Sequence, residues 1–155
     1  MKGQYKSPLG VITYVVEDGF LVGMEFSDEP IEFIDHPDIN KIHLALDRYF
    51  KHQSKEFDLD LKFMRGTPFQ KEVWERLLAI PYGQTKSYID IAREINREKA
   101  VRAVGQACKR NPIGIIVPCH RVIGKDGSMT GYSGKDYIDL KKMLLIHEQG
   151  YTHER

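Results

Sequence analysis

The chain has 155 residues, 41% of them hydrophobic and 29% charged, which is typical of one or two small globular domains and excludes a fibrous or disordered protein. Its longest apolar run, residues 113–118, is too short to span a membrane, and two cysteines without CxxC spacing predict neither a disulfide scaffold nor a zinc site. The net charge of +1 is the sum of −5 over residues 1–63 and +6 over residues 64–155. The basic second part therefore either binds a polyanion or exposes a solvated basic surface.

The first 63 residues predict a small α+β scaffold domain. Two β-prone runs, Val11–Val16 and Phe20–Phe26, flank Asp18-Gly19, a dipeptide favoured in hairpin turns. Apolar residues at helical spacing predict a helix over Pro37–Phe50, and alternation predicts a short strand over Phe57–Phe63. No secretion signal precedes these elements, so we expect a cytoplasmic protein with free thiols.

Residues 64–155 begin with three predicted helices. Thr67 is a suitable N-cap with Pro68 at the first helical position, and this helix ends before Pro81. A second helix, capped by Ser87, leads through a short polar turn to a third over Lys99–Arg110. Two short helices joined by a tight turn predict a helix-turn-helix. The small residues of the third helix favour either close helix packing or close approach to DNA.

The third helix ends at Asn111-Pro112, and an apolar run that we interpret as a strand leads to Pro118 and Cys119. Positive charge near a thiol favours the nucleophilic thiolate, and the adjacent His120 could act as its base directly or through a water molecule. The alternative is that Cys119 is a small buried hydrophobic residue. A glycine-rich segment follows, and then a last helix is predicted over Lys135–Gln149.

Two motifs favour the reactive interpretation of the cysteine. Residues 111–123 read NPIGIIVPCHRVI, and Gly-Tyr-Ser-Gly occupies residues 131–134. This pair resembles the active-site region of the O6-alkylguanine-DNA alkyltransferases, also called methylated-DNA–protein-cysteine methyltransferases. The resemblance covers residues 64–150. It implies an α+β fold with a small N-terminal antiparallel-sheet domain, and a C-terminal helical, winged-helix-like domain that holds a helix-turn-helix and the active-site cysteine.

The resemblance implies a catalytic role for five residues. Cys119 is the alkyl acceptor, His120 takes its proton through a water molecule, and Glu148 orients His120. Asn111 braces the turn between the recognition helix and the active-site strand. Tyr88 offers its hydroxyl group to N3 of the base, because a guanine anion leaves only when donors stabilise its developing charge.

The resemblance also implies a DNA substrate. The lesion in double-stranded DNA is O6-alkylguanine, with O4-alkylthymine as an open alternative, and it is extruded from the helix for the transfer. Arg102 fills the space left in the stack, and Ser133 presents its backbone N–H to O6. The other implied DNA or substrate contacts are Tyr132, Ala103, Gly105 and Arg121. We expect the protein to act once, without a cofactor, a metal, a membrane or an obligate protein partner, and a monomer is the default oligomeric state.

The sequence departs from the family pattern after the Gly-Tyr-Ser-Gly motif. Lys135 stands where a second glycine is usual, and the segment up to Lys141 is about two residues longer than the family pattern. These differences concern the loop beside the pocket and therefore the size of alkyl group that is accepted. We interpret Cys108, on the recognition helix, as a packing residue.

Other functions remain open from the residues alone. A non-catalytic helix-turn-helix protein that regulates transcription or binds alkylated DNA would explain the basic second part, but not Cys119 followed by His120. A cysteine hydrolase is disfavoured because its cysteine and histidine are normally distant in sequence. A cofactor-dependent methyltransferase is disfavoured because no GxGxxG motif occurs.

Overall fold

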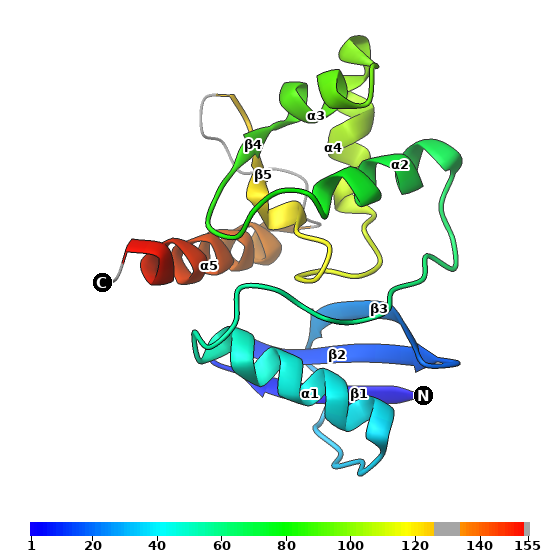
Figure 1. The fold of residues 1–155 in the computed structure, drawn as a ribbon, viewed down its shortest axis with the longest axis vertical. Helices are drawn as coiled ribbons and strands as arrows, with labels where there is room; N and C mark the ends of the chain where they lie inside the picture. The colour runs from blue at the N-terminus through cyan, green and yellow to red at the C-terminus, as the bar shows by residue number, and fades with distance from the viewer. Residues whose placement is uncertain (126–133, 154–155) are drawn as a thin grey trace. The chain divides into compact units, whose positions relative to one another are not determined.

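The computed structural model describes residues 1–125 and 134–153, and the chain divides into two compact units (Figure 1). The first unit is Met1–Met64 with Pro112–Ile116, and the second is Arg65–Asn111 with Val117–Arg155. A short segment late in the chain therefore belongs to the first unit. None of the described helices has the length and hydropathy that a membrane span needs.

The first unit is built on an antiparallel sheet of three strands in the order β1 (Lys2–Ser7), β2 (Gly10–Glu17) and β3 (Phe20–Ser27). The predicted hairpin is β2 and β3, and its turn has Asp18 at φ 51° and Gly19 at φ 82°. Positive φ at both positions matches the twist of the flanking strands. The sequence analysis did not predict β1, which pairs with β2 along its whole length.

One helix, α1 (Pro37–Phe50), covers a face of this sheet (Figure 1). His36 caps it by accepting a hydrogen bond from the backbone of Asp38, and Pro37 occupies the first turn. The side chains that α1 buries, at helical spacing, are Ile39, Ile42, Leu46, Tyr49 and Phe50. They form the core of the first unit together with residues of the sheet such as the fully buried Ile12 and Tyr14.

Two predicted strands are absent from the structure. Of residues 57–63, only Leu61 forms a bridge, to Leu21 of β3. The apolar run before Cys119 turns instead of extending, and only Ile113 forms a bridge, to Met24. The backbone N–H of Ile116 donates to Gly114 O at 2.8 Å across Ile115, which has φ 72°. A short apolar run can be buried in turns as well as in a strand, so periodicity could not distinguish the two.

The second unit begins with three helices, α2 (Pro68–Leu77), α3 (Tyr88–Glu94) and α4 (Val101–Lys109). Thr67 and Gln70 form a capping box at α2, and Ser87 and Asp90 form another at α3. A single 3₁₀ turn, η1 (Glu98–Ala100), joins α3 to α4 in the predicted helix-turn-helix. Trp74 of α2 is buried and its indole N–H donates to the Ala107 carbonyl at 2.8 Å, which fixes α2 against α4.

The rest of the second unit consists of short elements and one long helix. The two-residue strands β4 (Lys86–Ser87) and β5 (Val122–Ile123) pair in parallel. Directly before β5 lies the 3₁₀ turn η2 (Cys119–Arg121), and the last helix is α5 (Gly134–His153). Helix α5, red in Figure 1, lies beside the yellow η2. This contact brings the cysteine motif and the C-terminal helix together.

Gly66→Ala should destabilise the protein by about 2 kcal/mol or more. Gly66 has φ 118°, and an added Cβ would lie 2.5 Å from the Trp74 ring. Urea unfolding measures the change. Gly150→Ala is the control, because its Cβ would meet no atom of the described residues within 4 Å, and alanine should stabilise α5 by up to about 1 kcal/mol. Equal stability of Gly66→Ala and wild type would contradict the close approach.

Candidate active site

The candidate nucleophile lies at the start of a tight turn. Cys119 is the first residue of η2 and is 2% exposed. Its backbone N–H donates to Val117 O at 2.8 Å, and the Asn111 side-chain amide donates to the same oxygen at 2.8 Å. Asn111 therefore joins the end of α4 to the residues that lead into Cys119. It connects to a turn, not to the strand that the sequence analysis expected.

His120 and Glu148 form a buried hydrogen-bonded pair. Nε2 of His120 lies 2.6 Å from Oε2 of Glu148, and neither side chain is exposed to solvent. A carboxylate only accepts hydrogen bonds, so Nε2 carries the proton and Nδ1 holds the lone pair. Among the described residues, Nδ1 has no hydrogen-bond partner. Burial lowers the pKa of His120 and outweighs the opposite effect of Glu148, so the imidazole is neutral at physiological pH.

Arg121 does not occupy the place expected of a DNA contact. It is 7% exposed, and its Nε and Nη2 donate to the two oxygens of Glu148 at 2.8 and 3.0 Å. Its Nη1 donates to Ile80 O at 2.7 Å. The expectation of a DNA-binding Arg121 was therefore wrong, because three of its donors are used inside the protein. The expectation followed from the family resemblance, and nothing in the local motif shows that Arg121 pairs with the distant Glu148.

Glu148 is ionised although it is buried. Burial opposes ionisation, but the hydrogen bonds and charges of its partners overcome this effect and hold the pKa of Glu148 well below its usual range. The backbone N–H of Gly83 also donates to Oε1 at 3.3 Å. Because His120 is neutral, the Arg121 guanidinium is the positive charge that balances this carboxylate.

Sequence reasoning missed Lys141. Its side chain is fully buried, and Nζ donates to the hydroxyl oxygen of Tyr88 at 3.0 Å. Burial lowers the pKa of Lys141, while the nearby Cys119 and Cys108 act in the opposite direction. The signal was present in the sequence. Lys141 precedes Glu148 by two helical turns, on the same face of α5 as the buried Leu144 and Leu145.

Cys108 lies on the buried face of α4 and is 1% exposed. Burial, followed by the effect of the nearby Cys119, raises the pKa of the Cys108 thiol far above its usual value. A thiol of this kind reacts slowly, because the thiolate is the nucleophile. This setting agrees with packing as the role of Cys108.

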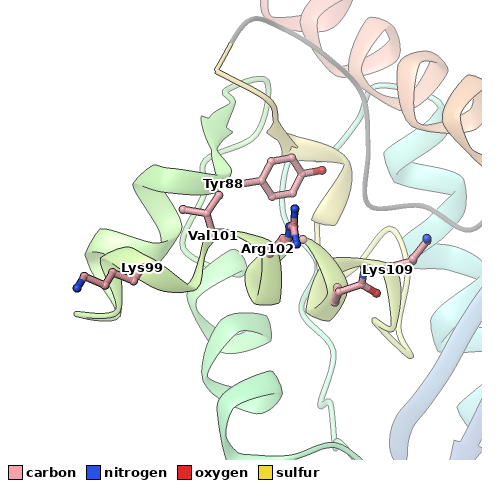
Figure 2. A pocket seen from close by; sticks show the side chains of 7 residues that line it. Tyr88, Lys99, Val101, Arg102 and Lys109 are labelled. Atoms are coloured by element: carbon pink, nitrogen blue, oxygen red, sulfur yellow. The ribbon is translucent and has the colours of Figure 1, made fainter.

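The opposite face of α4 carries the residues expected to contact DNA. Arg102 and Ala103 are exposed, and Gly105 is half-buried. A cavity of about 620 Å³ opens beside this face. It is lined by Tyr88, Lys99, Val101, Arg102, Gly105, Gln106 and Lys109. Figure 2 shows Arg102 near the ring of Tyr88, with Lys99 and Lys109 at opposite ends. The cavity is basic and large enough for a nucleobase.

A second cavity, of about 320 Å³, lies around the start of α3. Its lining includes Ser87, the neighbour of Tyr88, and three basic residues, Lys86, Arg93 and Lys125. Ser133 and Tyr132, also expected at the substrate, lie outside the described residues. Within the described part of the chain, no cluster of three or more His, Cys, Asp or Glu side chains could hold a metal ion.

Comparison with known proteins identifies the family. Residues 68–150 match the model of the 6-O-methylguanine DNA methyltransferase DNA-binding domain. The constitutive methylated-DNA–protein-cysteine methyltransferase of Bacillus subtilis is 41% identical over 154 residues, covering 93% of this chain and 92% of its own. That of Mycobacterium tuberculosis is 44% identical over 149 residues, covering 92% and 88%. This chain belongs to the methylated-DNA–protein-cysteine methyltransferase family.

Solved structures of methyltransferases in this family share the fold. The M. tuberculosis O6-methylguanine methyltransferase has a TM-score of 0.84 and 40% identity, covering 97% of this chain and 94% of its own. The M. tuberculosis protein in complex with DNA has a TM-score of 0.84 and 37% identity, covering 97% and 93%. The expected fold class, an N-terminal antiparallel sheet with a helical C-terminal part, is thereby confirmed.

Lys141→Met should increase the free energy of unfolding at pH 7. Because burial lowers the pKa of Lys141 from its ordinary 10.5, the folded protein binds this proton more weakly than the unfolded chain does. The cost is largest below the folded-state pKa and disappears above the unfolded value. The gain, measured by urea unfolding, should therefore be larger at pH 7 than at pH 10.

The adjacent Lys142 is exposed and supplies the control. Lys142→Met should change stability by less than about 0.5 kcal/mol at either pH. A Lys141→Met protein that is less stable than wild type at pH 7 would indicate that the Tyr88 contact outweighs the cost of burying the charge.

Proposed function

We propose that this protein repairs DNA by transferring the alkyl group of O6-alkylguanine irreversibly to the sulfur of Cys119. The observation that carries the proposal is the buried pair of His120 and Glu148, at 2.6 Å, directly after this cysteine. Family membership supports the reaction class, since the relatives are named methylated-DNA–protein-cysteine methyltransferases.

Activation of the thiol begins at His120. Its Nδ1 holds a lone pair and accepts the thiol proton, through a bridging water molecule, while Nε2–H stays bound to Glu148. The anionic Glu148 stabilises the imidazolium that forms. The sulfur then attacks the alkyl carbon, so that a carbon–sulfur bond forms and the bond from that carbon to O6 breaks, with its electron pair passing to guanine.

The departing guanine anion needs a proton, and Tyr88 supplies it at N3. The Tyr88 oxygen accepts a hydrogen bond from Lys141 Nζ at 3.0 Å, and a phenol hydroxyl group can accept at its oxygen while it donates its hydrogen to a base. Tyr88 also lines the basic cavity beside α4. Lys141 stabilises the phenolate as the proton leaves, which makes this contact stronger in the transition state than in the ground state.

Duplex DNA binds at the exposed face of α4. The small side chain of Ala103 and the absence of one at Gly105 let the helix backbone approach the minor groove. Extrusion of the lesion costs a few kcal/mol, and Arg102 offsets part of this cost by filling the gap in the stack. We expect the extruded nucleotide to enter at the cavity that Arg102 and Tyr88 line, and Lys99 and Lys109 at its opposite ends supply positive charge for the DNA phosphates.

The product is a thioether, and none of the described side chains near Cys119 offers a chemistry that would cleave it. Each molecule therefore acts once, and repair is stoichiometric. O4-alkylthymine carries an alkyl group on an equivalent exocyclic oxygen and is the second candidate lesion for the same cavity.

Cys119→Ser should abolish the transfer and leave DNA binding largely intact, because a serine hydroxyl is barely ionised at neutral pH. Intact-mass spectrometry after incubation with O6-methylguanine duplex should show one added methyl group in wild type and none in the variant. Cys108→Ala is the matched control and should retain full stoichiometry. Methylation of Cys119→Ser would overturn the assignment of the acceptor, and binding without any transfer by wild type would favour a non-catalytic DNA-binding protein.

Arg102→Ala should slow the repair of duplex DNA by roughly tenfold to a hundredfold, which is the rate equivalent of part of the extrusion cost. Its reaction with free O6-methylguanine base should change much less, because a free base leaves no gap in a stack. The measurement is the ratio of the two rate constants. Arg110→Ala removes the same charge from an exposed residue outside the cavity lining and should leave the ratio unchanged. An unchanged ratio in Arg102→Ala would assign Arg102 to general surface charge.

A further inference from the structure

Arg121 is a buried cation that the proposed transfer does not use. It lies in η2 directly after His120 and binds both oxygens of Glu148, at 2.8 and 3.0 Å. A third donor anchors it to Ile80 O at 2.7 Å, and its guanidinium lies 5.6 Å from the centre of the Tyr82 ring. Such a guanidinium cannot reorient toward a substrate without breaking these contacts.

The buried group formed by His120, Arg121 and Glu148 has no net charge only because Arg121 is positive. Arg121 carries +1 and Glu148 −1, so a neutral His120 leaves the group of three without net charge. Without Arg121, the buried carboxylate would be unbalanced, and the nearest group able to gain a proton is His120, whose Nε2 already touches it at 2.6 Å. An unpaired buried charge is costly, so the imidazole would be protonated at rest.

The protonation state of His120 decides whether it can act as a base. The neutral form has a lone pair at Nδ1, whereas the imidazolium has a hydrogen on both ring nitrogens and accepts nothing. We propose that Arg121 is a positioning residue that balances the charge of Glu148 and so keeps His120 neutral and able to take the thiol proton. This inference rests on the proposed function and adds a residue through which His120 is controlled.

The other charged groups near His120 leave this conclusion unchanged. On α5, Lys141 acts with Arg121 to lower the pKa of His120, and Glu148 acts against them. On η2, Cys119 precedes it, and Tyr82 approaches the cluster from the segment after α2. Removal of Arg121 leaves Lys141 in place, but the bidentate contact to Glu148 is lost. The pKa of His120 should therefore rise.

The experiment compares wild type with Arg121→Met and Arg121→Lys, using free O6-methylguanine base so that DNA contacts do not contribute. The transfer rate is measured from pH 5 to 9, and the His120 ring is titrated in parallel by NMR. In Arg121→Met the acid limb and the ring titration should move to higher pH by about one unit, a tenfold loss of rate on the acid side. Arg121→Lys keeps the charge and should keep the wild-type midpoint, with a lower plateau rate.

A charge-restoring variant separates this role from a structural one. Glu148→Gln alone should move the His120 titration to lower pH, and Arg121→Met combined with Glu148→Gln should return it to near the wild-type value. The double variant contains no unbalanced buried charge, so its His120 titration can still be measured and still tests the proposal if Arg121→Met alone does not fold. The control is Arg76→Met, because Arg76 pairs with Glu94 at 2.6 Å but is 43% exposed, and its profile should match wild type.

The outcomes distinguish the two proposals. An Arg121→Met protein with the wild-type midpoint, or a double variant whose midpoint stays displaced, would overturn the role of Arg121 while wild type still transfers the methyl group. No transfer by wild type would overturn the proposed function, and the NMR titration would still test the effect of Arg121 on His120.

Discussion

Burial of the Glu148 carboxylate is the constraint on which the second unit depends. An ionised carboxylate without solvent is stable only if donors surround it. Here those donors come from separate parts of the chain: His120 and Arg121 in η2, and Gly83 in the segment after α2. The hydrogen bonds to this one buried carboxylate therefore hold α5, η2 and the segment after α2 together. The same contacts that stabilise the fold also hold the imidazole beside the cysteine.

This sharing of contacts links stability to pH. Because the pKa of Glu148 is lowered in the folded protein, its ionisation stabilises the fold above the unfolded-state pKa, and this contribution is lost as the pH falls toward the folded-state value. Lys141 has the opposite sign, since its burial costs stability wherever it is charged. The buried Lys141 lies beside Tyr88 and donates a hydrogen bond to its hydroxyl oxygen. We interpret its cost as the consequence of placing a proton donor at the departing base.

The sequence predicted the elements with strong local signals. The caps at Thr67 and Ser87, the Asp18-Gly19 turn and the apolar spacing of α1 depend on neighbouring residues alone, and all are present in the structure. The expected strand before Cys119 is absent, because whether an apolar run extends or turns is decided by its tertiary partners. Strand β1 was not predicted, although it pairs with β2 along its whole length.

The candidate site was predicted only in part, because some of its residues depend on local sequence and others on distant partners. Cys119 and His120 stand in a specific local motif, whereas the partner of a charged side chain depends on contacts across the chain. Arg121 was expected at the DNA because the family resemblance implied it, and the local sequence does not show that its partner is the buried Glu148. Lys141 was missed because lysines on a last helix are usually solvated. Only the periodicity of the buried positions on α5 distinguished it from the exposed Lys142.

Two arginines of the same basic stretch have opposite environments, and the difference explains how one small unit binds DNA and performs chemistry. Arg102 is exposed on α4, where its charge acts on solvent and on whatever approaches the cavity. Arg121 is buried, where its charge acts on one carboxylate at 2.8 Å. Salt screens the first charge and leaves the second almost unaffected. Binding to DNA can therefore weaken with ionic strength while the protonation state of His120, set by Arg121 and Glu148, stays the same.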